Sequence, residues 1–97
     1  MDVLIAEDHA DSREILELFL THSGHAVTAV ADGDEALAAL QELCFDAVLL
    51  DLEMPRMGGI ETVRRIRQNP AFAALPVYAV SAHTTEELDR KSTRLNS

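Results

Sequence analysis

Four side chains able to take part in chemistry each follow a short apolar run in this 97-residue sequence: the acids Glu7, Asp8 and Asp51 and the hydroxyl of Ser81. Carboxylates that are brought together repel one another unless they bind a hard cation, share a proton or are screened by solvent. Mg²⁺ suits such a group best, with Glu7 and Asp8 as its ligands. Asp51 is then the best-placed nucleophile for a phosphoryl group, and Ser81 could donate a hydrogen bond to a phosphoryl oxygen.

The apolar runs that precede these residues alternate with segments of helical periodicity. The predicted strands are Val3–Ala6, Ala26–Ala31, Ala47–Leu50 and Val77–Val80. The first predicted helix begins at Asp11 and stops at Gly24, and the second covers Glu35–Leu43. The third covers Ile60–Ile66 and ends at Asn69–Pro70. Thr84–Leu88 has the pattern of the first turn of a further helix. In the first helix, Asp11 and Glu14 have the spacing of a capping box, and Ile15, Leu16, Phe19 and Leu20 form one apolar face.

Continuously apolar strands that alternate with helices predict an α/β fold, a doubly wound parallel sheet with helices on both faces. Ligands bind such sheets at the carboxyl ends of the strands. The acids and Ser81 all follow strand ends, so we expect them to converge on one edge of the sheet.

Composition narrows the function classes. Ninety-seven residues make one domain at most, and the net charge of −9 disfavours binding to nucleic acid. The apolar runs are far shorter than the roughly 20 residues of a membrane helix, and no leader opens the chain, so we expect a cytoplasmic protein that binds no membrane. The single cysteine, Cys44, is expected in or near the core.

Three segments of the chain, in this order and spacing, resemble the receiver domain of two-component response regulators. They are the pair Glu7–Asp8, the run Asp51–Gly59 and the strand end Pro76–Ala82. The resemblance covers Asp2 to about Leu88 and implies a flavodoxin-like sheet of strand order 2-1-3-4-5.

The resemblance also implies a role for individual residues. It makes Asp51 the phosphoacceptor, supplied by a histidine kinase or a phosphotransfer protein, and it implies a homodimer through the distal face of the complete domain. The implied Mg²⁺ ligands are Glu7, Asp8, Asp51 and the backbone carbonyl of Glu53. Ser81 is implied to be the switch hydroxyl, and Ala82 the small residue that leaves space for the phosphate. Pro55 and Gly58 are implied to shape the loop over the site. Because the family catalyses its own phosphorylation and dephosphorylation, such a chain lies between an enzyme and a binding module.

The C-terminal part departs from the family pattern. The fifth strand, the fifth helix and the lysine after that strand are expected to be missing, because Lys91 follows Ser81 too closely to take that place. Residues 89–97 carry three of the eight basic residues and resemble a translated sequencing adapter. We therefore expect a partial receiver domain over 1–88 and a non-native tail over 89–97. The loss would leave the fourth strand as an open edge and uncover the sheet face of the first helix, which predicts low stability.

Two other functions stay open at this stage. A phosphatase or phosphotransferase would share the Asp51 chemistry, but that class commonly has a second aspartate where Glu53 stands. A phosphorylation-independent interaction module, or a non-functional truncated fragment, would keep the fold without the chemistry.

Overall fold

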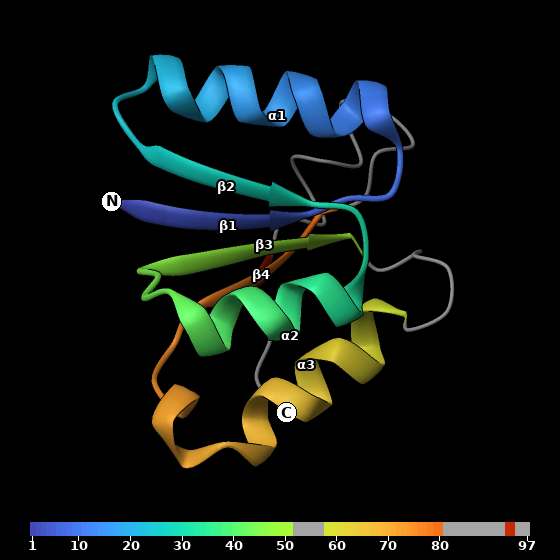
Figure 1. The fold of residues 1–97 in the computed structure, drawn as a ribbon, viewed down its shortest axis with the longest axis vertical. Coiled ribbons are helices and arrows are strands. Elements are labelled where there is room, and N and C mark those ends of the chain that lie inside the picture. The colour runs from blue at the N-terminus through green and yellow to red at the C-terminus, as the bar shows by residue number, and fades with distance from the viewer. Residues whose placement is uncertain (52–57, 81–92, 95–97) are drawn as a thin grey trace.

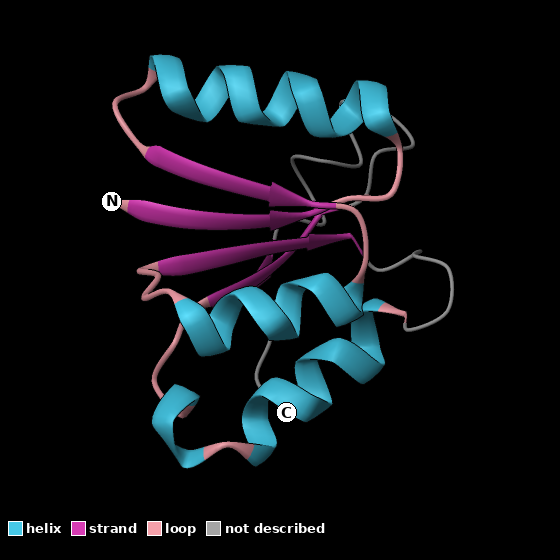
Figure 2. Cartoon of the chain, in the orientation of Figure 1, coloured by secondary structure: helices cyan, strands magenta, loops and turns pink. Residues whose placement is uncertain are grey.

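The computed structural model describes residues 1–51, 58–80 and 93–94, and its helices and strands alternate along the chain (Figure 2). The strands are β1 (Asp2–Ala6), β2 (Ala26–Val30), β3 (Ala47–Asp51), β4 (Val77–Val80) and β5 (Thr93–Arg94). The helices are α1 (Ala10–His22), α2 (Gly33–Glu42) and α3 (Gly59–Gln68), with a 3₁₀ turn, η1, at Pro70–Phe72. None of the helices in these ranges has the length and apolar content that a membrane crossing requires.

The strands form one sheet of order β2-β1-β3-β4-β5. The first four are parallel, which confirms the predicted doubly wound α/β sheet and its 2-1-3-4 order. β5 runs antiparallel to β4 and pairs Thr93 with Ala79 and Arg94 with Tyr78. The prediction of an open edge on β4 is therefore wrong at these two positions. The non-native origin of residues 89–97 stays a prediction, and the expected opening of a helix at residues 84–88 lies outside the described residues.

The two faces of the sheet are covered by different helices, with α1 on one side and α2 and α3 on the other (Figure 1). Side chains alternate between the faces along a strand. Leu4 and Ala6 of β1 join Val48 and Leu50 of β3 in the core beneath α2 and α3, where all four are buried. α2 and α3 complete this core with Ala36, Leu40, Val63 and Ile66.

The ends of α1 have two different causes. Its N-cap is His9, which makes no side-chain capping bond, so the predicted Asp11–Glu14 capping box is wrong. Its C-terminal end is the predicted stop: Gly24 has φ +95°, a left-handed conformation that glycine adopts without steric cost. The amide of His25 then donates to the carbonyl of Leu20 at 3.1 Å, which closes the helix end.

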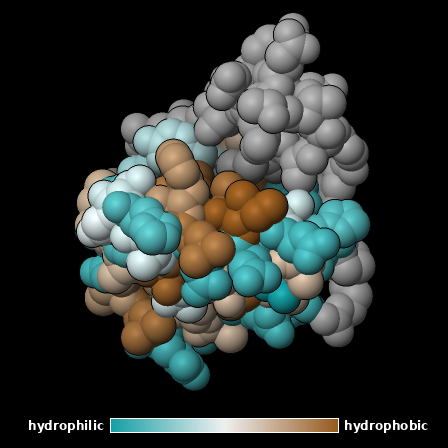
Figure 3. Space-filling view, turned by 90° about the horizontal axis from the view of Figure 1, so that it is seen from above, coloured by the Kyte–Doolittle hydropathy of each residue, from teal (hydrophilic) through white to brown (hydrophobic). Residues whose placement is uncertain are grey.

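The apolar side chains of α1 divide between the sheet and solvent. Leu16 and Leu20 are half-buried, whereas Ile15, Leu18 and Phe19 are 66%, 52% and 66% exposed. Ile15 and Phe19 thus belong to the predicted apolar face by spacing, but in the described structure they lie largely in solvent. Seen from above in Figure 1, which is the side of α1, the surface carries hydrophobic side chains among hydrophilic ones (Figure 3).

α2 begins with a reciprocal pair of side-chain caps. Asp32 accepts from the amide of Glu35 at 2.9 Å, and the Glu35 carboxylate accepts from the amide of Ala31 at 2.8 Å. Side-chain caps of this kind satisfy amides that the first helical turn leaves without partners. After the helix, Cys44 is exposed, so its predicted place in the core is wrong.

We expect the same substitution to have different effects at two isoleucines. Ile66→Val removes a methyl group from a fully buried side chain and should lower the free energy of unfolding by about 0.5–1.5 kcal/mol. Ile15→Val removes it from a largely exposed side chain and should change that free energy by less than about 0.5 kcal/mol. Urea unfolding followed by circular dichroism measures both, and equal losses would contradict the description of α1.

Candidate functional site

The pairing of β1 with β3 places two acids side by side. Ala6 of β1 is level with Leu50 of β3 in the parallel register. The next residue of each chain is an acid, Glu7 after Ala6 and Asp51 after Leu50. Because side chains alternate between faces, both acids lie on the face opposite the core residues that precede them. The predicted convergence of Glu7 and Asp51 at the carboxyl edge thus follows from strand register.

Asp8 joins these two acids to form a compact group. One carboxylate oxygen from each of Glu7, Asp8 and Asp51 lies within 4.8 Å of the others. Glu7 is 1% exposed and Asp51 is 7% exposed, while Asp8 is half-buried. These three predicted site residues therefore come together as the sequence indicated.

Three hydrogen bonds hold Glu7 in place. Its amide donates to the carbonyl of Val30 at 3.0 Å, which extends the pairing of β1 with β2 by one residue. Its carboxylate accepts from the amide of His9 at 3.2 Å. Its carbonyl accepts from Nη1 of Arg13 at 3.0 Å. Both the main chain and the side chain of Glu7 are thereby fixed.

Burial and charge change the acidity of Glu7. Burial, followed by a hydrogen bond to Asp51 and the negative charge of Asp51, raises the pKa of the Glu7 carboxyl to about 7. The bond from the amide of His9 opposes this effect on the pKa, because it stabilises the ionised carboxylate. Without a cation, the Glu7 carboxyl therefore keeps its proton to a higher pH than an ordinary glutamate does.

The group has the donor set that a hard divalent cation prefers. All three residues offer carboxylate oxygens, the ligands that Mg²⁺ favours. Oδ1 of Asp8 is buried and has no hydrogen-bond partner. A buried polar atom without a partner is unfavourable unless something binds it. The three side chains therefore fit a cation such as Mg²⁺.

Among the other predicted site residues, Gly58 alone belongs to the described part of the chain. Glu53, Pro55, Ser81 and Ala82 lie outside the described residues. Gly58 is described and is the N-cap of α3, where its carbonyl accepts from the amide of Thr62 at 3.0 Å and from the Thr62 hydroxyl at 2.9 Å.

Sequence reasoning missed two contributions to the site, the amide of His9 and the guanidinium of Arg13. The backbone bond from His9 has no signature in residue type. The contribution of Arg13 did have a signature in the sequence. Arg13 precedes Leu16 by three residues and Leu20 by seven, and it therefore shares their face of α1. A charged residue on that face required a partner.

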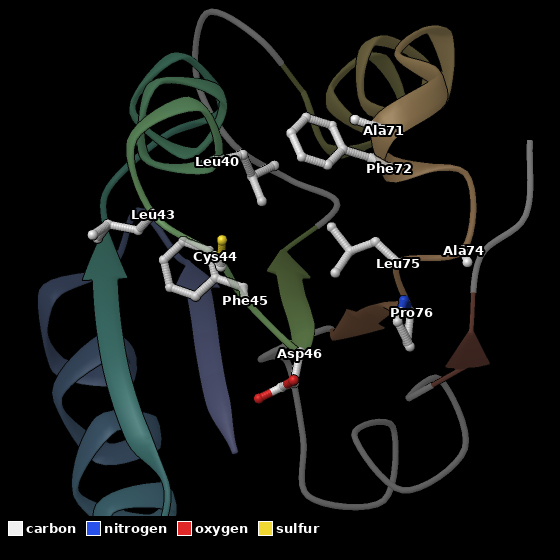
Figure 4. Close-up of a pocket in the computed structure, with 10 residues that line it drawn as sticks. All are labelled: Leu40, Leu43, Cys44, Phe45, Asp46, Ala71, Phe72, Ala74, Leu75 and Pro76. Atoms are coloured by element: carbon white, nitrogen blue, oxygen red, sulfur yellow. The ribbon is translucent and has the colours of Figure 1, made fainter.

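A cavity of about 380 Å³ lies away from the acids, between the C-terminal end of α2 and the segment from η1 to β4 (Figure 4). Leu40, Phe45, Phe72 and Leu75 line it with apolar groups. Its one carboxylate, Asp46, accepts from the amide of Asp2 at 2.8 Å. Because this cavity lies where β3 and β4 begin, it is at the end of the sheet opposite the acidic group.

Comparisons with known proteins agree on one family. Residues 3–96 match the response regulator receiver domain. The chain is 35% identical over 92 residues to an uncharacterized 14.6 kDa protein in the sodA1 3′ region of Leptolyngbya boryana, covering 95% of this chain and 70% of that protein. It is 38% identical over 87 residues to the autoinducer 2 sensor kinase/phosphatase LuxQ of Vibrio parahaemolyticus, covering 90% of this chain and only 10% of LuxQ.

A solved structure has the same fold. The N-terminal domain of a response regulator receiver protein from Methanoculleus marisnigri superposes with a TM-score of 0.80 at 32% identity, over 92% of this chain and 74% of that one. The strand order and the family and structure matches agree with one another. The chain therefore belongs to the response regulator receiver domains of two-component systems.

Proposed function

We propose that Asp51 is the phosphoacceptor of this receiver domain. The observation that carries the proposal is the position of its carboxylate, at the end of a buried strand and within 4.8 Å of two further carboxylates. An ionised carboxylate at such a place is a nucleophile that can form an acyl phosphate.

The transfer is a displacement at phosphorus. A carboxylate oxygen of Asp51 attacks the phosphoryl group of a phosphohistidine, and the bond from phosphorus to the imidazole nitrogen breaks. The electron pair of that bond returns to the nitrogen, which takes up a proton as it leaves. The bonds to Glu7 hold the neighbouring carboxylates still while the donor approaches. Ser81 is proposed to donate a hydrogen bond to the transferred group.

The carboxylates of Glu7, Asp8 and Asp51 would hold Mg²⁺, with the carbonyl of Glu53 proposed as a further ligand. When bound, the cation offsets the repulsion between an anionic nucleophile and an anionic phosphoryl group. Pro55 and Gly58 are proposed to shape the loop over the site, and Ala82 to leave space for the phosphate.

The proposed partner is a histidine kinase or a phosphotransfer protein. LuxQ, which matches this chain over one tenth of its length, is a sensor kinase/phosphatase, and that arrangement supports the proposal. A homodimer through the distal face, the absence of nucleic-acid binding and a cytoplasmic location stay predictions.

We expect the 97-residue chain to take up phosphate on Asp51 when incubated with ³²P-labelled acetyl phosphate and Mg²⁺. Asp51→Asn removes the nucleophilic oxygen and should reduce the alkali-labile label to background. Asp34→Asn, at an exposed position in the first turn of α2, is the matched control and should keep the label. Unlabelled wild-type protein that is folded would favour the interaction module, and equal label on Asp51→Asn would contradict the assignment.

The raised pKa of Glu7 predicts a pH dependence of stability when divalent cations are removed with EDTA. The pKa is 4.5 in the unfolded chain and about 7 in the folded one, so the folded state binds this proton more tightly. The resulting stabilisation is fully present below pH 4.5 and is lost as the pH rises through 7. It amounts to about 1–3 kcal/mol of unfolding free energy.

Glu7→Gln should lack this component, because its amide does not titrate. The test compares urea unfolding of the two proteins between pH 5 and pH 8. Glu17→Gln, on the exposed side of α1, serves as control and should follow the wild type. Parallel curves for wild type and Glu7→Gln would contradict the predicted shift.

A further inference from the structure

Arg13 lies on α1 where its neighbours along the helix predict an apolar residue. Positions 13, 16 and 20 share one side of a helix, and Arg13, Leu16 and Leu20 are all half-buried there. A half-buried guanidinium is unfavourable unless hydrogen bonds replace its lost water. Its partner is the carbonyl of Glu7, which accepts from Nη1 at 3.0 Å.

Arg13 lies near the three acids of the site, so it matters whether its guanidinium binds a carboxylate or a carbonyl. Within the described residues, Arg13 forms no ion pair with Glu7 or Asp8 and bonds a carbonyl oxygen instead. The carboxylate oxygens of Glu7 and Asp8 are therefore not neutralised by this cation. The guanidinium instead constrains the main chain between them.

Two bonds from Arg13 close the turn that carries these acids. Its amide donates to the carbonyl of His9 at 2.9 Å, as the first turn of α1 requires. Its guanidinium reaches six residues back to the carbonyl of Glu7. The peptide that joins Glu7 to Asp8 is thereby fixed from the helix side, while the amide of Glu7 is fixed by Val30 of β2.

We propose that Arg13 is a positioning residue for the acidic site, which holds the Glu7 carbonyl and thereby fixes the directions of the Glu7 and Asp8 carboxylates toward a divalent cation. The inference rests on the proposed function, because it concerns the same carboxylates. It adds a residue that touches neither the cation nor the phosphoryl group.

The direction in which one substitution changes the affinity for a divalent cation separates this role from a purely electrostatic one. Removing a positive charge near a cation site strengthens cation binding if charge alone acts. Removing a residue that orients ligands weakens it, typically by tenfold or more. Arg13→Met keeps the length of the side chain and suits the apolar stripe, so we expect it to fold.

The probe is Mn²⁺, whose free concentration is read by electron paramagnetic resonance on the full chain. We expect Arg13→Met to bind Mn²⁺ about tenfold more weakly than wild type. Arg13→Lys, which keeps a donor and the charge, should recover most of the affinity. Arg64→Met, at an exposed arginine that pairs with Glu61 on α3, removes the same charge elsewhere and should leave the affinity unchanged or slightly higher.

Equal or tighter Mn²⁺ binding by Arg13→Met overturns the proposal, and so does a fall in its urea midpoint with no change in affinity. If Arg13→Met does not fold, the NMR signals of the Arg13 guanidinium in the wild type decide. Slow rotation about the bond from Cζ to Nη supports the hydrogen bond, and free rotation overturns it. The proposed function is tested separately. It stands if the wild type is labelled on Asp51, even when Arg13→Met binds Mn²⁺ normally. Both proposals are overturned if the wild type binds no Mn²⁺ and takes up no label.

Discussion

Parallel pairing between β1 and β3 brings like charges together at the carboxyl edge of the sheet. Ala6 is level with Leu50, so Glu7 and Asp51 meet one residue beyond the last buried pair. Burial is the main cause of the raised pKa of Glu7, and the hydrogen bond to Asp51 and the charge of Asp51 add to it. The apolar cluster that contains Ala6 and Leu50 lies on the opposite face and offers no positive charge to these acids. A bound cation does supply one, which is why the geometry favours a metal-assisted phosphoacceptor.

The sequence allowed the sheet and the acidic group to be predicted because both obey simple rules. Continuous apolar strands that alternate with helices can be covered only in a parallel sheet, and a parallel sheet collects its strand ends at one edge. Glu7, Asp8 and Asp51 each follow such a strand directly. Their convergence therefore needed no knowledge of side-chain contacts. The resemblance to receiver domains rested on these acids together with the run to Gly59 and the strand end Pro76–Ala82, and the family match confirmed it.

Other features depend on contacts that residue type does not specify. The first helix begins after His9, whose amide donates to the carboxylate of Glu7, and Asp11 is not its N-cap. Ile15 and Phe19 have helical spacing with Leu16 and Leu20, yet only Leu16 and Leu20 pack toward the sheet. Periodicity shows which side chains share a helix face, but the tertiary neighbours of that face decide how much of it is buried.

The arrangement separates the source of stability from the source of function within single strands. Ala6 and Leu50 contribute buried apolar surface, and the next residues contribute charge on the other face. An unfavourable apo site also couples occupancy to stability, because any ligand that binds the folded state alone stabilises it. A cation held as proposed by Glu7, Asp8 and Asp51 would therefore add to the free energy of unfolding, because it would offset the repulsion between these carboxylates.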